Sequence, residues 1–371
     1  MRARSNLCAR PGLLFAFALA FATGACGNDL PKATVITHMR VLGAQVSVLG
    51  DPTRSTPKPG ETATLTFRVV YPSVETSDAE LSSFLFSCTA PATYTGVPTC
   101  QELVDALQRP VRPGQDKVEL EGGNCKGFEG KSAVTGTLGE TCVTNTPKIK
   151  VKIEPDSKVG AKLVLGVICR NGWPFVDPSA ANIFGCDPKP GKQSSEVETI
   201  GVYATIRVEH SAEFQNKNPD LGLGTFKISP LTGAELDGAA VWPPAKAADL
   251  PATDDDCIDA AKANLLTTAD GEVDTIRIAY PTKARELHEG VLETLEVSSY
   301  ATAGELSQRF TLFDPEAPVV HGQLQTDLTW KLSKAEKAAV GVNGKLVRFF
   351  FTVLDHRGGF DSTMRAVCVR R

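Results

Sequence analysis

The strongest constraint on the fold of this chain is an alternation of apolar and polar residues in short segments that recur over most of its length. In one of them, 62–67, three threonines alternate with Ala63, Leu65 and Phe67. A period of two places successive side chains on opposite faces of a β-strand, so each segment predicts a half-buried strand. Helical patterns are few and short. The sequence therefore predicts an all-β fold.

The expected strands form two groups along the chain. The first group is 62–71, 81–88, 148–153, 162–169 and 196–208. The second group is 225–229, 273–280, 293–301, 305–313, 323–332, 346–354 and 363–370. At roughly 150 residues per domain, the two groups predict two domains, 35–210 and 211–371. Short strands with spaced turns are typical of immunoglobulin-like β-sandwiches, which is the fold we expect for each domain.

One long segment of the first domain, 89–147, is rich in loops and cysteines and is predicted to be an insertion. A capping box of Thr99 and Glu102 predicts one short helix inside it. A second capping box, formed by Ser333 and Glu336, predicts a helical turn in the second domain.

The turn between the last two expected strands contains Gly358 and Gly359. Both glycines are expected to adopt the positive φ that a tight hairpin requires.

The N-terminus has the pattern of a secretory signal peptide over residues 1–25. Three arginines precede an apolar run, 13–22, and small residues then lead to Cys26. The run is about half as long as the roughly 20 residues that a membrane-spanning helix needs. The small residues before Cys26 resemble the lipobox of bacterial lipoproteins, although Thr23 stands where an aliphatic residue is usual. The resemblance implies that the Cys26 thiol carries lipid, with 26–34 as a linker; cleavage nearby without lipid is the alternative.

The charge balance argues against a nucleic-acid partner. Three of the 39 basic residues lie in the first 25 positions, which leaves 36 basic against 43 acidic residues in the remainder. A nucleic-acid-binding domain would instead concentrate an excess of basic residues.

Cysteine usage agrees with export. Eight cysteines remain beyond Cys26, and an even number in an oxidising compartment predicts four disulfides. Cys257 and Cys368 are the only ones after residue 186, so we expect them to pair. The local scheme for the others is Cys88–Cys100, Cys125–Cys142 and Cys169–Cys186. The alternative joins Cys88 to Cys169 and Cys100 to Cys186.

No metal site is predicted from the cysteines, because there is no Cys-x-x-Cys and no cysteine lies near a histidine. His288-Glu289 begins like the His-Glu-x-x-His helix of zinc proteases, but Leu292 occupies the second ligand position. No nucleophile elbow and no cofactor-binding motif occur, so the sequence predicts neither catalytic residues nor a cofactor.

Three further features each have a structural and a functional interpretation. The acidic run 254–256 is expected to cap a helix, with calcium binding as the alternative. The segment 216–220, Asn-Lys-Asn-Pro-Asp, is expected to form a turn at the domain boundary, again with calcium as the alternative. The tryptophans are expected to be core residues or partly buried, with a sugar-stacking platform as the alternative. These are Trp173, Trp242 and Trp330.

Several segments carry a resemblance to a known kind of protein. Residues 348–362, Arg-Phe-Phe-Phe-Thr-Val-Leu-Asp-His-Arg-Gly-Gly-Phe-Asp-Ser, resemble the final hairpin of PKD-type and other bacterial immunoglobulin-like domains. Residues 39–44 and 59–65 resemble the opening strands of such domains. Together with 216–221, they are similar to myxobacterial-type surface lipoproteins with tandem immunoglobulin-like domains. The resemblance implies a fold and an outer-membrane or other cell-envelope location, and it supplies no catalytic residues.

The expected function is therefore a non-enzymatic one. We expect a lipid-anchored envelope protein that binds or scaffolds an envelope protein or a glycan through loops at the ends of its sandwiches. The alternative is an accessory subunit, or a hydrolase with unrecognised residues, that acts on envelope polysaccharide.

Overall fold

The computed structural model describes residues 33–370, with gaps at 74–80, 91–140, 145, 159, 177–183, 212, 214, 230–239, 247–249, 252, 258–265 and 269–270. The signal peptide, Cys26, Cys100, Cys125, the helix expected at Thr99 and the helix expected after Asp256 lie outside the described residues. The described chain is built mainly of β-strands, which confirms the predicted all-β class. None of its helices is long and apolar enough to cross a membrane.

Residues 40–207 form two antiparallel sheets and a hairpin. The first sheet has the order β1 (Arg40–Val48), β2 (Thr62–Val70), β5 (Lys148–Lys152). The second has the order β4 (Thr141–Thr144), β3 (Leu81–Thr89), β6 (Ala161–Arg170), β9 (Glu198–Arg207). The hairpin joins β7 (Gly172–Val176) to β8 (Phe184–Pro188). Apolar residues from both sheets, among them Leu65, Val151 and Ile206, share one core, so the sheets face each other.

The central strands β3 and β6 are buried on both faces. Phe84 and Phe86 of β3 and Leu165 of β6 point away from the shared core into a second cluster, which also contains Phe184 of β8. The β7–β8 hairpin therefore covers the outer face of this sheet. This double burial explains why the sequence of β6 is apolar from Leu163 to Cys169 rather than alternating.

Residues 225–369 form a second pair of sheets. One sheet has the order β11 (Ala240–Val241), β10 (Thr225–Ser229), β13 (Glu272–Pro281), β20 (Gln323–Lys331), β17 (Glu305–Leu306), with β19 (Val319–Val320) also on β20. The other has the order β12 (Leu266–Thr268), β22 (Phe360–Val369), β21 (Lys345–Leu354), β16 (Leu295–Ala301), β18 (Phe310–Phe313). A small hairpin pairs β14 (Leu287–His288) with β15 (Val291–Leu292). Between the main sheets lies a large core that includes Phe349 and Phe351.

Two tryptophans anchor this larger core. Trp242 and Trp330 are 2% and 1% exposed, and their rings lie 5.0 and 5.2 Å from the ring of Phe349. Trp330 Nε1 donates to the Ala303 carbonyl oxygen and Trp242 Nε1 to that of Ala366. This confirms core packing for both and contradicts a sugar platform built from all three tryptophans.

The helical content is small, and the second capping box is confirmed. The helix α3 spans Lys334–Ala338, and the Ser333 side chain accepts from the Glu336 N–H while Glu336 reaches back to the Ser333 N–H. The other helical segments in the described residues are single 3₁₀ turns: η1 (Ser194–Glu196), η3 (Leu221–Leu223) and η6 (Thr282–Ala284).

Three sequence predictions need correction. Strand β4 lies inside 89–147, which was expected to be loop, because Thr141–Thr144 pairs with the edge of β3. The strand expected at 305–313 is divided between two sheets, with β17 on β20 and β18 on β16. In the last hairpin Gly358 has a φ of +108°, but the second left-handed residue is His356 rather than Gly359.

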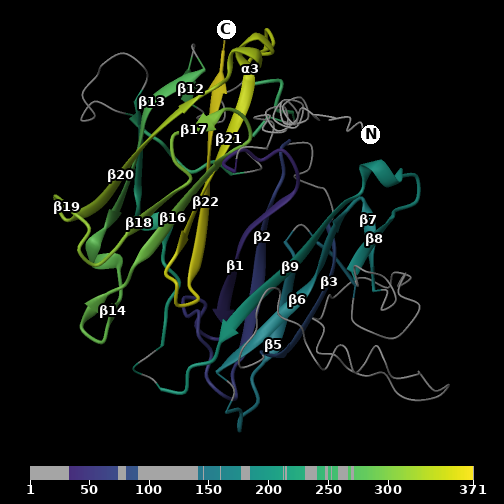
Figure 1. The fold of residues 1–371 in the computed structure, drawn as a ribbon, viewed down its shortest axis with the longest axis vertical. Helices are drawn as coiled ribbons and strands as arrows, with labels where there is room; N and C mark the ends of the chain where they lie inside the picture. The colour runs from purple at the N-terminus through teal and green to yellow at the C-terminus, as the bar shows by residue number, and fades with distance from the viewer. Residues whose placement is uncertain are drawn as a thin grey trace, which may run out of the picture. The chain divides into compact units, whose positions relative to one another are not determined.

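Residues 34–371 form one compact unit. Strand β1 contacts β22, as Figure 1 shows, and the ring of Phe360 lies against Gly43, where a Cβ atom would overlap it. Beside this contact, Leu42 and Val70 pack on Phe350 and Met364. An apolar cluster thus joins the outer face of the sheet containing β21 and β22 to the first sheet of the chain.

Candidate functional site

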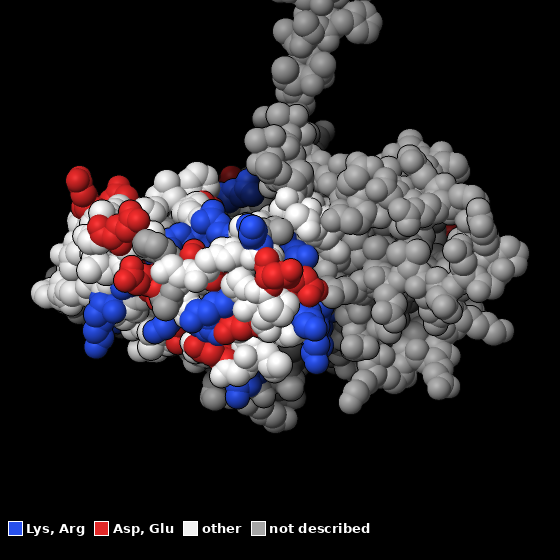
Figure 2. Space-filling model, turned by 90° about the horizontal axis from the view of Figure 1, so that it is seen from below, with Lys and Arg blue, Asp and Glu red and all other residues white. Residues whose placement is uncertain are grey.

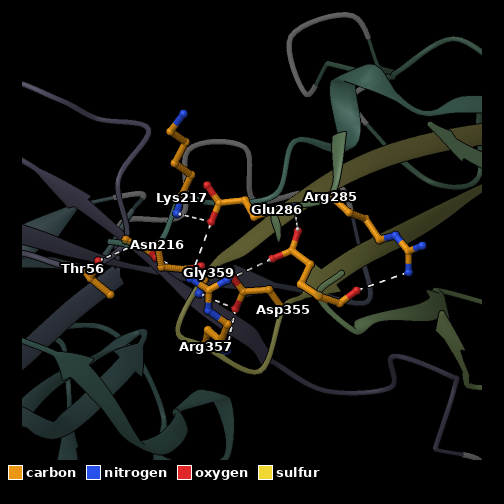
Figure 3. Close-up of polar contacts among 10 residues, drawn as sticks. Thr56, Asn216, Lys217, Arg285, Glu286, Asp355, Arg357 and Gly359 are labelled. Atoms are coloured by element: carbon orange, nitrogen blue, oxygen red, sulfur yellow. Dashed lines mark hydrogen bonds and ion pairs between the residues drawn. The ribbon is translucent and has the colours of Figure 1, made fainter. Parts of the chain in front are cut away.

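A buried polar cluster lies next to that apolar contact, and burial raises the pKa of its Glu293 carboxyl and lowers the pKa of its Arg285 guanidinium. It is drawn in Figure 3, and we call it the junction cluster. Its residues come from the loop after β1, the segment before η3, the β14–β15 region and the β21–β22 turn. They are Ser55, Thr56, Asn216, Lys217, Arg285, Glu286, Glu293, Asp355, Arg357 and Gly359.

Asn216 is the central donor of the junction cluster. It is 1% exposed, and its Nδ2 donates to Ser55 Oγ at 2.8 Å and to Asp355 Oδ2 at 2.5 Å. Its backbone N–H donates to Thr56 Oγ1, and its carbonyl oxygen accepts from the Ser55 N–H. One asparagine therefore connects the loop after β1 to the last hairpin of the chain.

Asp355 is the central acceptor, and it is 2% exposed. Its Oδ1 accepts from the backbone N–H groups of Arg357 and Gly359, both at 2.8 Å, which closes the β21–β22 turn around the carboxylate. A Cβ atom at Gly359 would lie 2.8 Å from the Lys217 carbonyl oxygen. Glycine is needed there because the segment before η3 approaches the turn closely, and not because of its φ.

The segment 216–220 uses its side-chain oxygens mostly for N–H donors. Asn218 Oδ1 accepts from the Phe360 N–H, and Asp220 Oδ1 accepts from the Gly222 N–H at 2.7 Å. Asn216 presents its N–H group, not its oxygen, to Asp355. Among the described residues, no three His, Cys, Asp or Glu side chains are grouped to hold a metal ion. The arrangement therefore favours the structural interpretation of this segment over calcium.

Glu293 is the carboxyl with the most unusual environment. Its side chain is 2% exposed, and Oε1 accepts from the Glu286 N–H at 2.9 Å. Oε2 accepts no hydrogen bond, and Arg357 Nη1 lies 4.0 Å away. Burial, with the nearby charges of Asp355 and Glu286, raises the pKa of Glu293 to about 7. The hydrogen bond from the Glu286 N–H and the charge of Arg357 only partly oppose the rise.

A carboxyl group with a pKa near 7 is suited to general acid–base chemistry. Glu293, however, is enclosed by the protein, and its one hydrogen bond is to a backbone amide. Arg285 closes the same region, since its Nη1 donates to the carbonyl oxygens of Glu293 and Asp314. The geometry assigns Glu293 to the internal structure of the junction, where its ionisation affects stability.

Asp254, from the acidic run expected to cap a helix, takes part in an ion pair. Asp254 forms an ion pair with Arg348 at 3.6 Å, and Arg348 Nη2 also donates to the carbonyl oxygen of Tyr71. Burial lowers the pKa of Arg348.

A hollow of about 250 Å³ lies elsewhere, on the outer face of the β10–β13–β20 sheet, where Lys227 and His321 are among its lining residues.

The segment that resembles a zinc-protease motif is not helical. His288 and Leu292 belong to the β14–β15 hairpin, and the two residues between the strands, Glu289 and Gly290, have φ values of +50° and +81°. Positive φ at both central residues defines a tight hairpin turn. This excludes the helix on which two zinc ligands four residues apart would share a face.

Two of the four predicted disulfides lie entirely within the residues that the structure describes. Cys169–Cys186 joins β6 to β8, as the local scheme expected, and Cys257–Cys368 joins a loop to β22, as expected for the only two cysteines after residue 186. Cys88 is also disulfide-bonded. Because Cys169 is bonded to Cys186, the alternative pairing of Cys88 with Cys169 is wrong. The predicted pairs of Cys100 and of Cys125 with Cys142 fall outside the residues whose side chains are described.

Sequence reasoning missed the charged part of the junction cluster. Glu293, Asp355 and Arg357 were seen only as members of strands and turns. A signal for Asp355 was present, since an acidic residue follows the apolar run Phe349–Phe351 and Val353–Leu354 of strand β21 and stands four residues before a glycine. No local pattern points to Glu293, because the groups around it come from distant segments.

Charge on the surface is mixed. Figure 2 shows basic and acidic side chains interspersed on the face viewed from below, rather than gathered into one field of a single sign. The bidentate pair of Arg277 and Asp327, across β13 and β20, is an example of such local compensation.

Comparisons with known proteins identify no family for the chain. No protein-family model and no curated protein matches it. Among solved structures, one match is "Escherichia coli alpha-2-macroglobulin activated by porcine elastase", at 11% identity and a TM-score of 0.18. The match covers 89% of this chain and 22% of the other. Similarity at this level establishes neither a common fold nor a common activity.

Proposed function

We propose that the chain is a non-enzymatic, lipid-anchored protein of the cell envelope, attached through Cys26, with a binding or scaffolding role. Its two pairs of sheets are proposed to be immunoglobulin-like sandwiches, with a boundary near residue 210. The proposed partners are an envelope protein or a glycan, contacted through loops at the sandwich ends. The location is proposed to be the outer membrane, facing the periplasm or the surface.

The observation that carries this proposal is the junction cluster. A buried hydrogen-bonded group that ties the loop after β1 to the β21–β22 turn restricts movement between the two pairs of sheets. A rigid body of this kind suits a protein that holds a binding surface away from a membrane. The disulfides support export, since such bonds persist in oxidising compartments.

The attachment is tested with Cys26→Ala. Two or three acyl chains, at about 0.8 kcal/mol per buried CH₂, would form an effectively permanent anchor. We expect the wild type to incorporate labelled fatty acid and to fractionate with membranes, and the variant to do neither. Equal membrane fractionation of both proteins, with no label in the wild type, would contradict the anchor.

The binding role is tested separately with the mature chain. Pull-down from envelope extracts and glycan-array binding are expected to identify a saturable ligand. Turnover of cell-wall or capsular polysaccharide by the purified protein would instead favour the hydrolase alternative and overturn the non-enzymatic proposal.

A further inference from the structure

Strand β5 is an edge strand with an unusual row of three lysines. In the sequence Lys-Ile-Lys-Val-Lys, Ile149 and Val151 are buried in the core, whereas Lys148, Lys150 and Lys152 are exposed. Alternate residues of a strand are about 6.8 Å apart, so the three ammonium groups form a regular row. None of the ion pairs of the described residues involves these lysines.

Among the described residues, no carboxylate lies opposite the row on the neighbouring strands. The lysines lie across from Thr66, Thr64 and Thr62 of β2, and the next strand, β1, adds Gln45 and Ser47. The row is therefore a local excess of positive charge on a chain whose formal net charge is −4.

The backbone of the same three residues faces away from the sheet. On the β2 side, the Ile153 N–H donates to the Glu61 carbonyl oxygen, and the Phe67 N–H donates to the Pro147 carbonyl oxygen. In an antiparallel pair, hydrogen-bonded residues alternate along the strand, so 147, 149, 151 and 153 face β2. The N–H and C=O groups of Lys148, Lys150 and Lys152 therefore point to the open edge, where no strand of the described residues pairs with β5.

We propose that this edge binds an extended acidic segment of a partner protein as an added antiparallel strand. Residues i, i+2 and i+4 of such a strand would each exchange backbone hydrogen bonds with one of the lysines. Their side chains would lie on the lysine face with the same 6.8 Å period, so acidic residues at these positions would each meet an ammonium group.

The lysines also explain how the edge avoids unwanted pairing. Lysine on an edge strand disfavours pairing with neutral or basic strands, including the same edge of a second copy of this chain. The lysines attract a strand with acidic side chains, so the edge favours acidic strands over neutral or basic ones. The inference goes beyond the proposed loop-mediated binding and does not depend on the lipid anchor.

The test uses the mature chain and a fluorescent peptide, Thr-Glu-Val-Glu-Val-Glu-Thr, followed by fluorescence anisotropy. We expect saturable binding that weakens at least about tenfold in the triple variant Lys148→Glu, Lys150→Glu, Lys152→Glu. A peptide with lysine in place of glutamate should show the reverse preference. The control variant Lys158→Glu, Lys246→Glu, Lys334→Glu changes the net charge equally at three exposed positions and should bind like the wild type.

Two further peptides separate strand addition from charge attraction alone. One has the same composition with its three glutamates adjacent, and the other carries N-methyl groups on the three glutamate amides. Both should bind at least about tenfold more weakly, because each keeps the charge and loses either the period or the edge hydrogen bonds. Equal binding of either peptide would overturn the proposal. So would lysine-dependent binding to dextran sulfate or to anionic phospholipid vesicles without binding to the alternating peptide.

Discussion

The side-chain amide of Asn216 donates a 2.5 Å hydrogen bond to the carboxylate of Asp355, 139 residues later in the chain. Both residues are buried. Asn216 also donates to Ser55 in the loop after β1, and Asp355 also accepts from the Gly359 N–H of its own turn. The pair joins the segment that follows the first two sheets to the hairpin that ends the chain. It is therefore the position at which a single substitution should most affect the coupling between the two pairs of sheets.

Asn216→Ala should destabilise the protein markedly. The substitution leaves Asp355 Oδ2 buried without its donor, and an unsatisfied buried group costs about 1 to 3 kcal/mol, more when it is charged. We expect the free energy of unfolding, measured with urea, to fall by about 2 to 3 kcal/mol. Asp327→Asn breaks the more exposed pair with Arg277 and should cost less than about 1 kcal/mol. A smaller effect for Asn216→Ala than for this control would contradict the role of the junction.

The pH dependence of stability should contain a contribution from Glu293. Its pKa is about 7 in the folded protein and about 4.3 in an unfolded chain, so the folded state binds the proton more tightly. This contribution is complete below pH 4 and is lost as the pH rises towards 7. Glu293→Gln should remove a decline on the order of 2 kcal/mol between pH 4.5 and 7.5, measured as the difference between urea titrations of variant and wild type.

A second glutamate provides a control of opposite sign. Lys337 lowers the pKa of Glu272, so the stability it contributes is present at neutral pH and is lost on acidification. Glu272→Gln should therefore change the difference curve in the opposite direction and by a smaller amount, because the group is at the surface. Parallel curves for wild type and Glu293→Gln would show that Glu293 ionises normally.

The disulfide of Cys169 and Cys186 should hold the β7–β8 hairpin over β3 and β6. Changing both cysteines to Ser should speed amide hydrogen exchange in 172–188, because Phe184 is then less firmly held against Phe84 and Phe86. Exchange in β21 and β22 should not change, since those strands lie in another core. Unchanged protection of the hairpin would mean that apolar contacts alone hold it.

The strands could be predicted from sequence because their burial follows a period of two. In β20 exposure alternates from Leu324 to Trp330, and in β5 the lysines alternate with Ile149 and Val151. Cys257–Cys368 was predictable by elimination. Strand β4 was missed because four residues at an edge carry too little pattern, and the split of 305–313 depends on which sheet each half joins.

The junction cluster shows a different limit of sequence reasoning. The segment 216–220 was recognised as unusual, and turn formation was predicted for it. Its hydrogen bonds to Ser55 and Asp355 depend on how distant segments meet, as does the environment of Glu293. No local sequence pattern contains that information.

The disulfide of Cys257 and Cys368 should contribute more to global stability than the disulfide of Cys169 and Cys186, because it closes a longer loop. It closes 111 residues of chain, and in the chain-entropy model a loop of that size stabilises by at most about 4 to 5 kcal/mol. Cys257 packs with Leu346 and Ala366 around the bond, so the bridge also fixes the loop on the outer face of β21 and β22. Changing both cysteines to Ser should lower the free energy of unfolding by about 3 kcal/mol or more.

The unfolding transition of the variant with Cys257 and Cys368 changed to Ser also tests whether the two pairs of sheets unfold together. Because residues 34–371 form one compact unit, joined by Asn216–Asp355 and by the apolar contact at Phe360, we expect one cooperative transition that shifts as a whole. The measurement compares the denaturant dependence of hydrogen exchange in β21 and β22 with that in β3 and β6. The variant Cys169→Ser, Cys186→Ser serves as the matched control, because it also loses one disulfide and two cysteines. Separate midpoints for the two pairs of strands would show that the halves unfold independently, and a wild type with both thiols free would show that the bond does not form.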